Sequence, residues 1–104
     1  MKVYFHESLG GVSCINKFSK QNDFVSLLVL FKGLNDDAKL TLEVSDIKQL
    51  KGINPKIYEI RKRGYRIFYT IKDSKLTILD IVNKKKNHTE KVIINRIKKR
   101  VKDI

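Results

Sequence analysis

Two arginines in the second half of the chain have a type and a spacing that suit phosphate binding. The stretch from Ile57 to Lys72 reads IYEIRKRGYRIFYTIK, in which two strand-like segments flank an Arg63-Gly64 pair. A two-residue turn at this pair, with Gly64 at positive φ, places Arg61 directly opposite Arg66. Guanidinium groups bind phosphate through bidentate hydrogen bonds. The sequence therefore predicts a hairpin that presents a phosphate-binding arginine pair.

The register of this hairpin decides which side chains share a face, because a slip of one residue turns every side chain over. A three-residue turn would put Arg61 and Arg66 on opposite faces and send one of them toward the core. We prefer the two-residue turn because it separates the charged face from an apolar face that a helix can cover. The charged face then carries Glu59, Arg61, Arg66, Phe68 and Thr70. The apolar face carries Tyr58, Ile60, Tyr65, Ile67, Tyr69 and Ile71.

Further candidate residues surround the arginine pair. Glu59 is a diagonal neighbour of Arg66, so the same face is also compatible with a solvated ion pair that binds nothing. A run of three lysines follows the next strand-like segment, and His88 comes shortly after it. Such a run alone is typical of a solvated loop. If it lies beside Arg61 and Arg66, cations from three stretches of the chain come together at one place. The additional candidates for contacts with a nucleic acid are Lys62, Arg63, Phe68 and Lys86.

The charge of the chain indicates the class of its partner. Its 104 residues are enough for one hydrophobic core, and 23 Lys and Arg against 11 Asp and Glu leave a net charge of +12. The acidic residues fall mainly in the first half, which leaves a basic second half. Such an excess favours polyanions, because each neutralised phosphate releases counterions. A membrane surface would also attract it.

The N-terminal segment and the single cysteine predict the compartment and the absence of cofactors. The start MKVYFHES lacks the apolar core of a signal peptide, and the apolar run from Phe24 to Phe31 is far shorter than the ~20 residues that cross a bilayer. Cys14 cannot form an internal disulfide and has no partner at a metal-ligand spacing. We therefore expect a cytoplasmic protein without a membrane segment, metal or cofactor.

The first half of the chain contains weaker structural signals. Residues Lys2 to His6 favour a strand, and Val12 to Ser19 favour a short helix. Asp23 is a suitable N-cap for a helix that ends near Gly33. For Asn35 to Leu50 we expect a helix followed by a loop, although the alternation of apolar residues at 40, 42 and 44 is also typical of a strand.

The second half contains three strands and a final helix. After a loop at residues 51–55, strands are predicted at 57–61, 65–72 and 76–83. The last of these is apolar on both faces except at Asp80, which indicates an interior strand. Thr89 can cap a final helix whose wet side carries Lys98, Lys99 and Lys102. Its packing stripe is Ile93, Ile97, Val101 and Ile104.

Four short motifs occur in order between about residues 50 and 100. They are LKG at 50–52, IYEIR at 57–61, YRIFY at 65–69 and VNKK at 82–85. With these spacings they resemble the HigB-like branch of the RelE/ParE toxin superfamily. The first half agrees with that family only in the order of its predicted elements. The resemblance implies one toxin domain over residues 1–104, with the α+β order β-α-α-β-β-β-α and a twisted sheet packed on helices.

The resemblance also implies an activity and partners. Such a toxin of a type II toxin-antitoxin system is a metal-independent endoribonuclease that cuts mRNA, typically on the ribosome. Its antitoxin is usually a small protein with a helix-turn-helix domain. Carried over by position, the basic active-site residues are Arg61, Arg66, Lys84 and Lys85.

The chemistry of metal-free RNA cleavage assigns further roles. The 2′-OH attacks the adjacent phosphate, and Arg61 and Arg66 would stabilise the phosphorane. Protons would move through Glu59, His88 or a lysine. A histidine has an ordinary pKa of ~6.5, which suits this work. Positions 80 and 82 hold aspartate and valine where relatives often have histidine and phenylalanine, so the identity of the acid and base stays open.

Two alternatives remain compatible with the sequence. A ParE-like toxin would have the same fold but would inhibit DNA gyrase instead of cutting RNA. A non-catalytic basic module would bind RNA with a steep salt dependence and without cleavage. The motifs of P-loop and dinucleotide-binding proteins do not occur in the chain.

Overall fold

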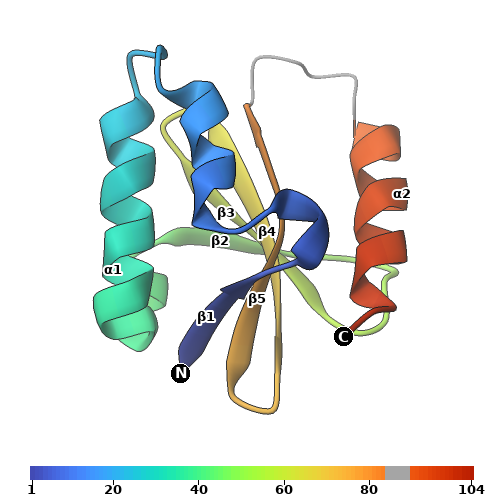
Figure 1. The fold of residues 1–104 in the computed structure, drawn as a ribbon. Coiled ribbons are helices and arrows are strands. Elements are labelled where there is room, and N and C mark those ends of the chain that lie inside the picture. The colour runs from blue at the N-terminus through green and yellow to red at the C-terminus, as the bar shows by residue number, and fades with distance from the viewer. Residues whose placement is uncertain (84–89) are drawn as a thin grey trace.

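The computed structural model describes residues 1–83 and 90–104, which form a central sheet with helices on both of its faces (Figure 1). The strands are β1 (Lys2–Phe5), β2 (Asp46–Leu50), β3 (Ile57–Lys62), β4 (Tyr65–Lys72) and β5 (Lys75–Asn83). The helices are the 3₁₀ helices η1 (Glu7–Leu9) and η2 (Val12–Phe18), and the α-helices α1 (Phe24–Glu43) and α2 (Glu90–Val101). The α+β class is confirmed, and the arrangement is compatible with a RelE-like fold.

The five strands form a mixed sheet in the order β1-β5-β4-β3-β2. β1 runs parallel to β5, and the other neighbours are antiparallel. The hairpin register is the one that the two-residue turn predicts, with Arg61 opposite Arg66. Arg63 and Gly64 both have positive φ, at 47° and 87°, as in the type I′ turns that match the twist of a hairpin.

The segment between Gly33 and Leu50 differs from the sequence prediction. α1 continues through Gly33 to Glu43, with non-helical backbone at Asp37, whose carboxylate accepts from the Leu40 amide at 3.1 Å. Gly33 does not end the helix, and a Cβ there would lie 2.7 Å from the Thr41 hydroxyl. The expected loop is also wrong, because residues 46–50 form β2 against β3. The sequence DIKQL has little alternation, so pairing with β3 defines this strand.

Two hydrophobic clusters lie on the two faces of the sheet. The larger joins α1 and the 3₁₀ helices to inward-facing residues such as Ile60, Ile67 and Ile81. The smaller lies under α2 and consists of Ile57, Phe68, Leu79, Ile93, Ile97 and Val101. The predicted packing stripe of the last helix is therefore confirmed, with Ile104 partly buried against it and Lys98, Lys99 and Lys102 exposed. The predicted cap at Thr89 lies outside the described residues.

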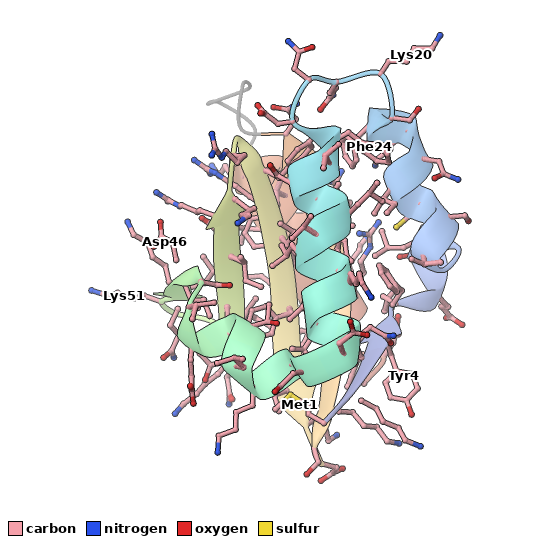
Figure 2. The ribbon with its side chains drawn as sticks, turned by 90° about the vertical axis from the view of Figure 1, so that its left-hand side faces the viewer. Met1, Tyr4, Lys20, Phe24, Asp46 and Lys51 are labelled. Carbon is pink, nitrogen blue, oxygen red and sulfur yellow. The ribbon has the colours of Figure 1, made fainter. Side chains whose placement is uncertain are left out.

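The two edges of the sheet lie far apart, as Figure 2 shows with Tyr4 of β1 on one side and Asp46 at the start of β2 on the other. β5 is an interior strand, as predicted. No helix in the described part of the chain has both the length and the apolar character needed to cross a membrane.

Candidate nucleic-acid interface

The arginine pair lines a groove between the β2 side of the sheet and α2. This groove has a volume of about 260 Å³ and is called the arginine groove below. Its charged residues come from β2 and the residue that follows it, from β3 and from β4, and its apolar wall includes Ile93 and Ile94 of α2. The charged residues are Lys48, Lys51, Glu59, Arg61 and Arg66. Among these described residues, four cations face one carboxylate, so the groove favours an anion.

Cross-strand pairing explains why these side chains meet. Residues directly opposite each other in antiparallel strands point to the same face of the sheet. One row runs Asp46, Arg61, Arg66 and Val82, and the next runs Lys48, Glu59, Phe68 and Asp80. β2, which the sequence prediction missed, therefore adds Lys48 to the charged face. The opposite charges of Lys48 and Glu59 could have indicated that β2 pairs with β3.

Glu59 and Arg61 form a partly buried ion pair. Arg61 Nε donates to Glu59 Oε1 at 2.8 Å, and the side chains are 29% and 4% exposed respectively. This excludes the freely solvated ion pair that the sequence left open. A buried carboxylate holds its partner firmly because separating them would leave a charge out of water. The contact therefore fixes the position of Arg61 at the groove.

The face that carries these residues is less open than expected. α2 covers much of it, and Glu59, Phe68 and Thr70 are all buried. Phe68 packs in the cluster under α2, so its ring has no free face on which a base could stack. The proposed stacking role of Phe68 is therefore wrong.

The remaining predicted residues belong to the β3–β4 turn or fall outside the described residues. Lys62 and Arg63 are exposed at the β3–β4 turn. β5 ends at Asn83, which pairs with Tyr65 beside the same turn. Lys84, Lys85, Lys86 and His88 lie outside the described residues.

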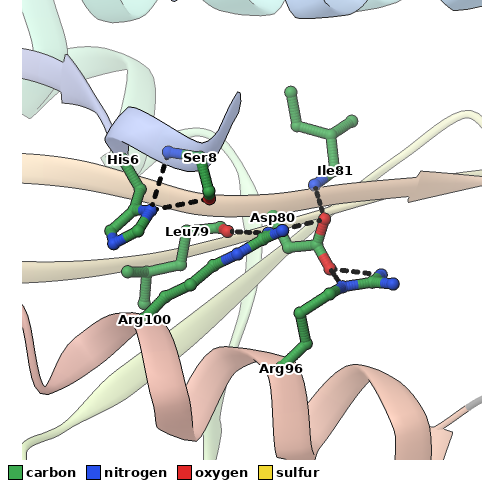
Figure 3. A network of polar contacts seen from close by, with 7 residues as sticks. All are labelled: His6, Ser8, Leu79, Asp80, Ile81, Arg96 and Arg100. Carbon is green, nitrogen blue, oxygen red and sulfur yellow. Dashed lines mark hydrogen bonds and ion pairs between the residues drawn. The ribbon is translucent and has the colours of Figure 1, made fainter. Parts of the chain in front are cut away.

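Asp80 forms a second ion-pair system, which Figure 3 shows. Its carboxylate is 5% exposed and accepts from Arg96 Nε at 2.8 Å and Nη2 at 2.6 Å. Arg100 Nη1 lies 3.3 Å from the other oxygen and donates to the Leu79 carbonyl at 2.7 Å. The Ile81 amide also donates to Asp80, at 2.9 Å. These contacts anchor α2 to β5, and with it the apolar wall of the arginine groove.

Sequence reasoning did not single out Arg96 and Arg100. A lone carboxylate in an apolar strand requires a buried partner. Two arginines four residues apart lie on one side of a helix. Together these two signals could have predicted the contact. The contact itself gives Asp80 a structural role.

His6 joins the N-terminal segment to the end of α2. The Ser8 amide donates to His6 Nδ1 at 3.1 Å, so Nε2 carries the proton and donates to Asp103 Oδ2 at 2.9 Å. The Ser8 hydroxyl lies 2.7 Å from Nδ1 as well (Figure 3). His6 does not line the arginine groove. Its contacts are those of a structural clamp.

A comparison with protein-family models decides the family. Residues 13–102 match the model of the phage-derived Gp49-like proteins (DUF891). The chain belongs to the Gp49-like family. This toxin-like family is related to RelE- and HigB-type toxins, and its members are generally toxins of toxin-antitoxin systems. Membership in the Gp49-like family implies an antitoxin partner. No curated protein and no solved structure matches the chain significantly.

Proposed function

We propose that this Gp49-like protein is the toxin of a type II toxin-antitoxin system and that it cuts mRNA in the cytoplasm, on the ribosome, as HigB-like toxins do. One toxin domain over residues 1–104 would perform this function. The observation that carries the proposal is the arginine groove, where Arg61 and Arg66 lie opposite each other and Glu59 holds Arg61. The matching partner is a single RNA strand whose phosphate enters between the arginines.

The proposed reaction needs no metal ion. The ribose 2′-OH attacks the adjacent phosphorus, the bond to the 5′ oxygen of the next nucleotide breaks, and a 2′,3′-cyclic phosphate and a 5′-OH result. Negative charge accumulates on the phosphorane oxygens. Arg61 and Arg66 would stabilise that charge, and the fixed position of Arg61 lowers the cost of reorganisation during the reaction.

Proton transfer is assigned to residues that follow β5 in the chain. Lys84, Lys85 and His88 are the proposed carriers, by their place in the family pattern and their chemistry. Glu59 is held by Arg61, so we propose that it mainly positions this arginine. Lys62, Arg63 and Lys86 would bind the RNA backbone, with binding that weakens as salt increases.

The neutralising partner is proposed to be a small antitoxin with a helix-turn-helix domain. The net charge of +12 favours an acidic partner for the toxin. Binding of such an antitoxin would prevent growth inhibition until it is degraded or released.

Inducible expression with mapping of transcript 5′ ends tests the proposed function. Wild type should arrest growth and produce codon-phased cuts, whereas Arg66→Ala should reduce cleavage by about 10²–10³-fold because a phosphorane ligand is lost. Lys39→Ala, which removes an exposed charge from α1, is the matched control and should cleave normally.

Two other outcomes would overturn the proposal. Growth arrest without RNA cuts, accompanied by gyrase-linked DNA breaks, would indicate a ParE-like toxin. Salt-dependent RNA binding without toxicity or cleavage would indicate a non-catalytic module.

A further inference from the structure

A second polar pocket lies at the hairpin end of the sheet, on the face that α1 covers. It has a volume of about 350 Å³, within the ~300–1,000 Å³ range of small-ligand sites, and is called the turn pocket below. Figures 1 and 2 show the loop before α1 at the same end of the molecule as the β3–β4 turn, and Figure 2 labels this loop at Lys20 and Phe24. The pocket residues used here are Lys20, Gln21, Asp23, Arg63 and Tyr65.

The amide of Gln21 is held in one orientation. Its Oε1 accepts from Tyr65 Oη at 2.6 Å and from Asn83 Nδ2 at 2.8 Å. Burial, and then the negative charge of Asp23, raises the pKa of the Tyr65 hydroxyl, which therefore remains a proton donor. Because both bonds end on the oxygen, Nε2 of Gln21 remains as a donor. Within the described chain this nitrogen makes no hydrogen bond.

Asp23 supplies an acceptor beside this donor. It occupies the N-cap position of α1, as the sequence predicts, but its side chain makes no capping hydrogen bond. The carboxylate is exposed and lines the turn pocket. A fixed amide donor and a carboxylate acceptor thus lie at one pocket, with Lys20 and Arg63 as cations at its rim.

We propose that the turn pocket binds one base of the RNA strand and prefers guanine. Guanine presents the acceptor O6 beside two nitrogen donors, which complement Gln21 Nε2 and the two oxygens of Asp23. The other bases do not present two neighbouring nitrogen donors with an acceptor. Lys20 and Arg63 bind the phosphates that flank this nucleotide. The inference rests on the proposed binding of RNA in the arginine groove.

The hairpin connects the two sites. Tyr65 and Arg66 are consecutive in β4, so they point to opposite faces only ~3.4 Å apart along the strand. Arg63 lies at the tip between them. A strand whose phosphate contacts Arg66 passes around this tip and places a neighbouring base in the turn pocket.

The experiment measures binding of 2′-O-methyl pentanucleotides that are identical except for A, C, G or U at the centre. They lack the nucleophilic hydroxyl, so binding is measured whether or not the protein cleaves RNA. Wild type should bind the guanine oligonucleotide about tenfold more tightly than the others, and Gln21→Ala and Asp23→Asn should each remove most of this preference. Asn16→Ala, an exposed amide on η2, is the matched control.

The outcomes separate this inference from the proposed function. Arg66→Ala should weaken binding of all four oligonucleotides equally and leave the preference for guanine. Equal binding of the four bases by wild type, or a preference that survives both pocket variants, would overturn the inference even if RNA is cleaved. A guanine preference in a protein that does not cleave RNA would support the pocket and refute the nuclease. Circular dichroism of each variant should show an unchanged helix content, which excludes unfolding as the cause.

Discussion

Two buried carboxylates lie in the same row across the sheet, and they are used differently. The side chains of Glu59 and Asp80 are 4% and 5% exposed, and Phe68 lies between them in the row. Asp80 binds two arginines of α2, so both of its carboxylate oxygens take part in holding this helix on the sheet. Glu59 binds one arginine of its own strand, in a groove with three further cations. The residues that line the arginine groove thus include more cations than carboxylates, whereas Asp80 is paired with two arginines.

The largest expected effect on stability comes from removing the anchor. Asp80→Ala leaves two arginines without their carboxylate and should lower the free energy of unfolding by about 3 kcal/mol, which urea denaturation measures. Asp36→Ala breaks only the exposed pair with Lys32 and should cost about 0.5 kcal/mol or less. Equal losses in the two variants would contradict the structural role of Asp80.

A smaller effect on stability, with a larger effect on activity, is expected at the other carboxylate. Arg61→Met leaves Glu59 buried and should cost about 2 kcal/mol. Adding Glu59→Gln removes the unpaired buried charge and should restore about half of the lost stability. RNA cleavage should be lost in both the single and the double variant. If the double variant regained cleavage, the arginine would not be needed at the phosphate.

At neutral pH the smallest effect is expected on the opposite face of the sheet, where Tyr58 and Tyr69 form a stacked pair. Burial, and then Tyr58, raises the pKa of Tyr69 to about 12. An unfolded tyrosine has a pKa of about 10. The folded state holds the proton more tightly, so this contribution is complete below pH 10 and is lost as the pH rises from about 10 to 12.

Tyr69→Phe tests that contribution. The variant should lose less stability than wild type between pH 10 and 12, as urea denaturation at each pH measures. The arginine ion pairs remain charged throughout this range and do not contribute to the difference. Identical pH profiles for the two proteins would show that the Tyr69 hydroxyl titrates normally.

The parts of the site that the sequence predicted correctly are local. The arginine pair follows from a two-residue turn and the alternation of side chains, both of which involve neighbouring residues. The stripe at Ile93, Ile97 and Val101 follows from helical periodicity in the same way. The placement of Phe68 at an open face was wrong because the position of α2 over the sheet is not a local property.

The sequence by itself therefore determined the strands of the hairpin, their register, the basic character of the second half and the packing stripe of the last helix. Only the tertiary structure decided that residues 46–50 form an edge strand, that α2 covers Phe68, and that Asp80 anchors this helix. These features depend on contacts between segments far apart in the chain. Periodicity and turn chemistry act over a few residues, whereas burial and charge pairing depend on which distant surfaces meet.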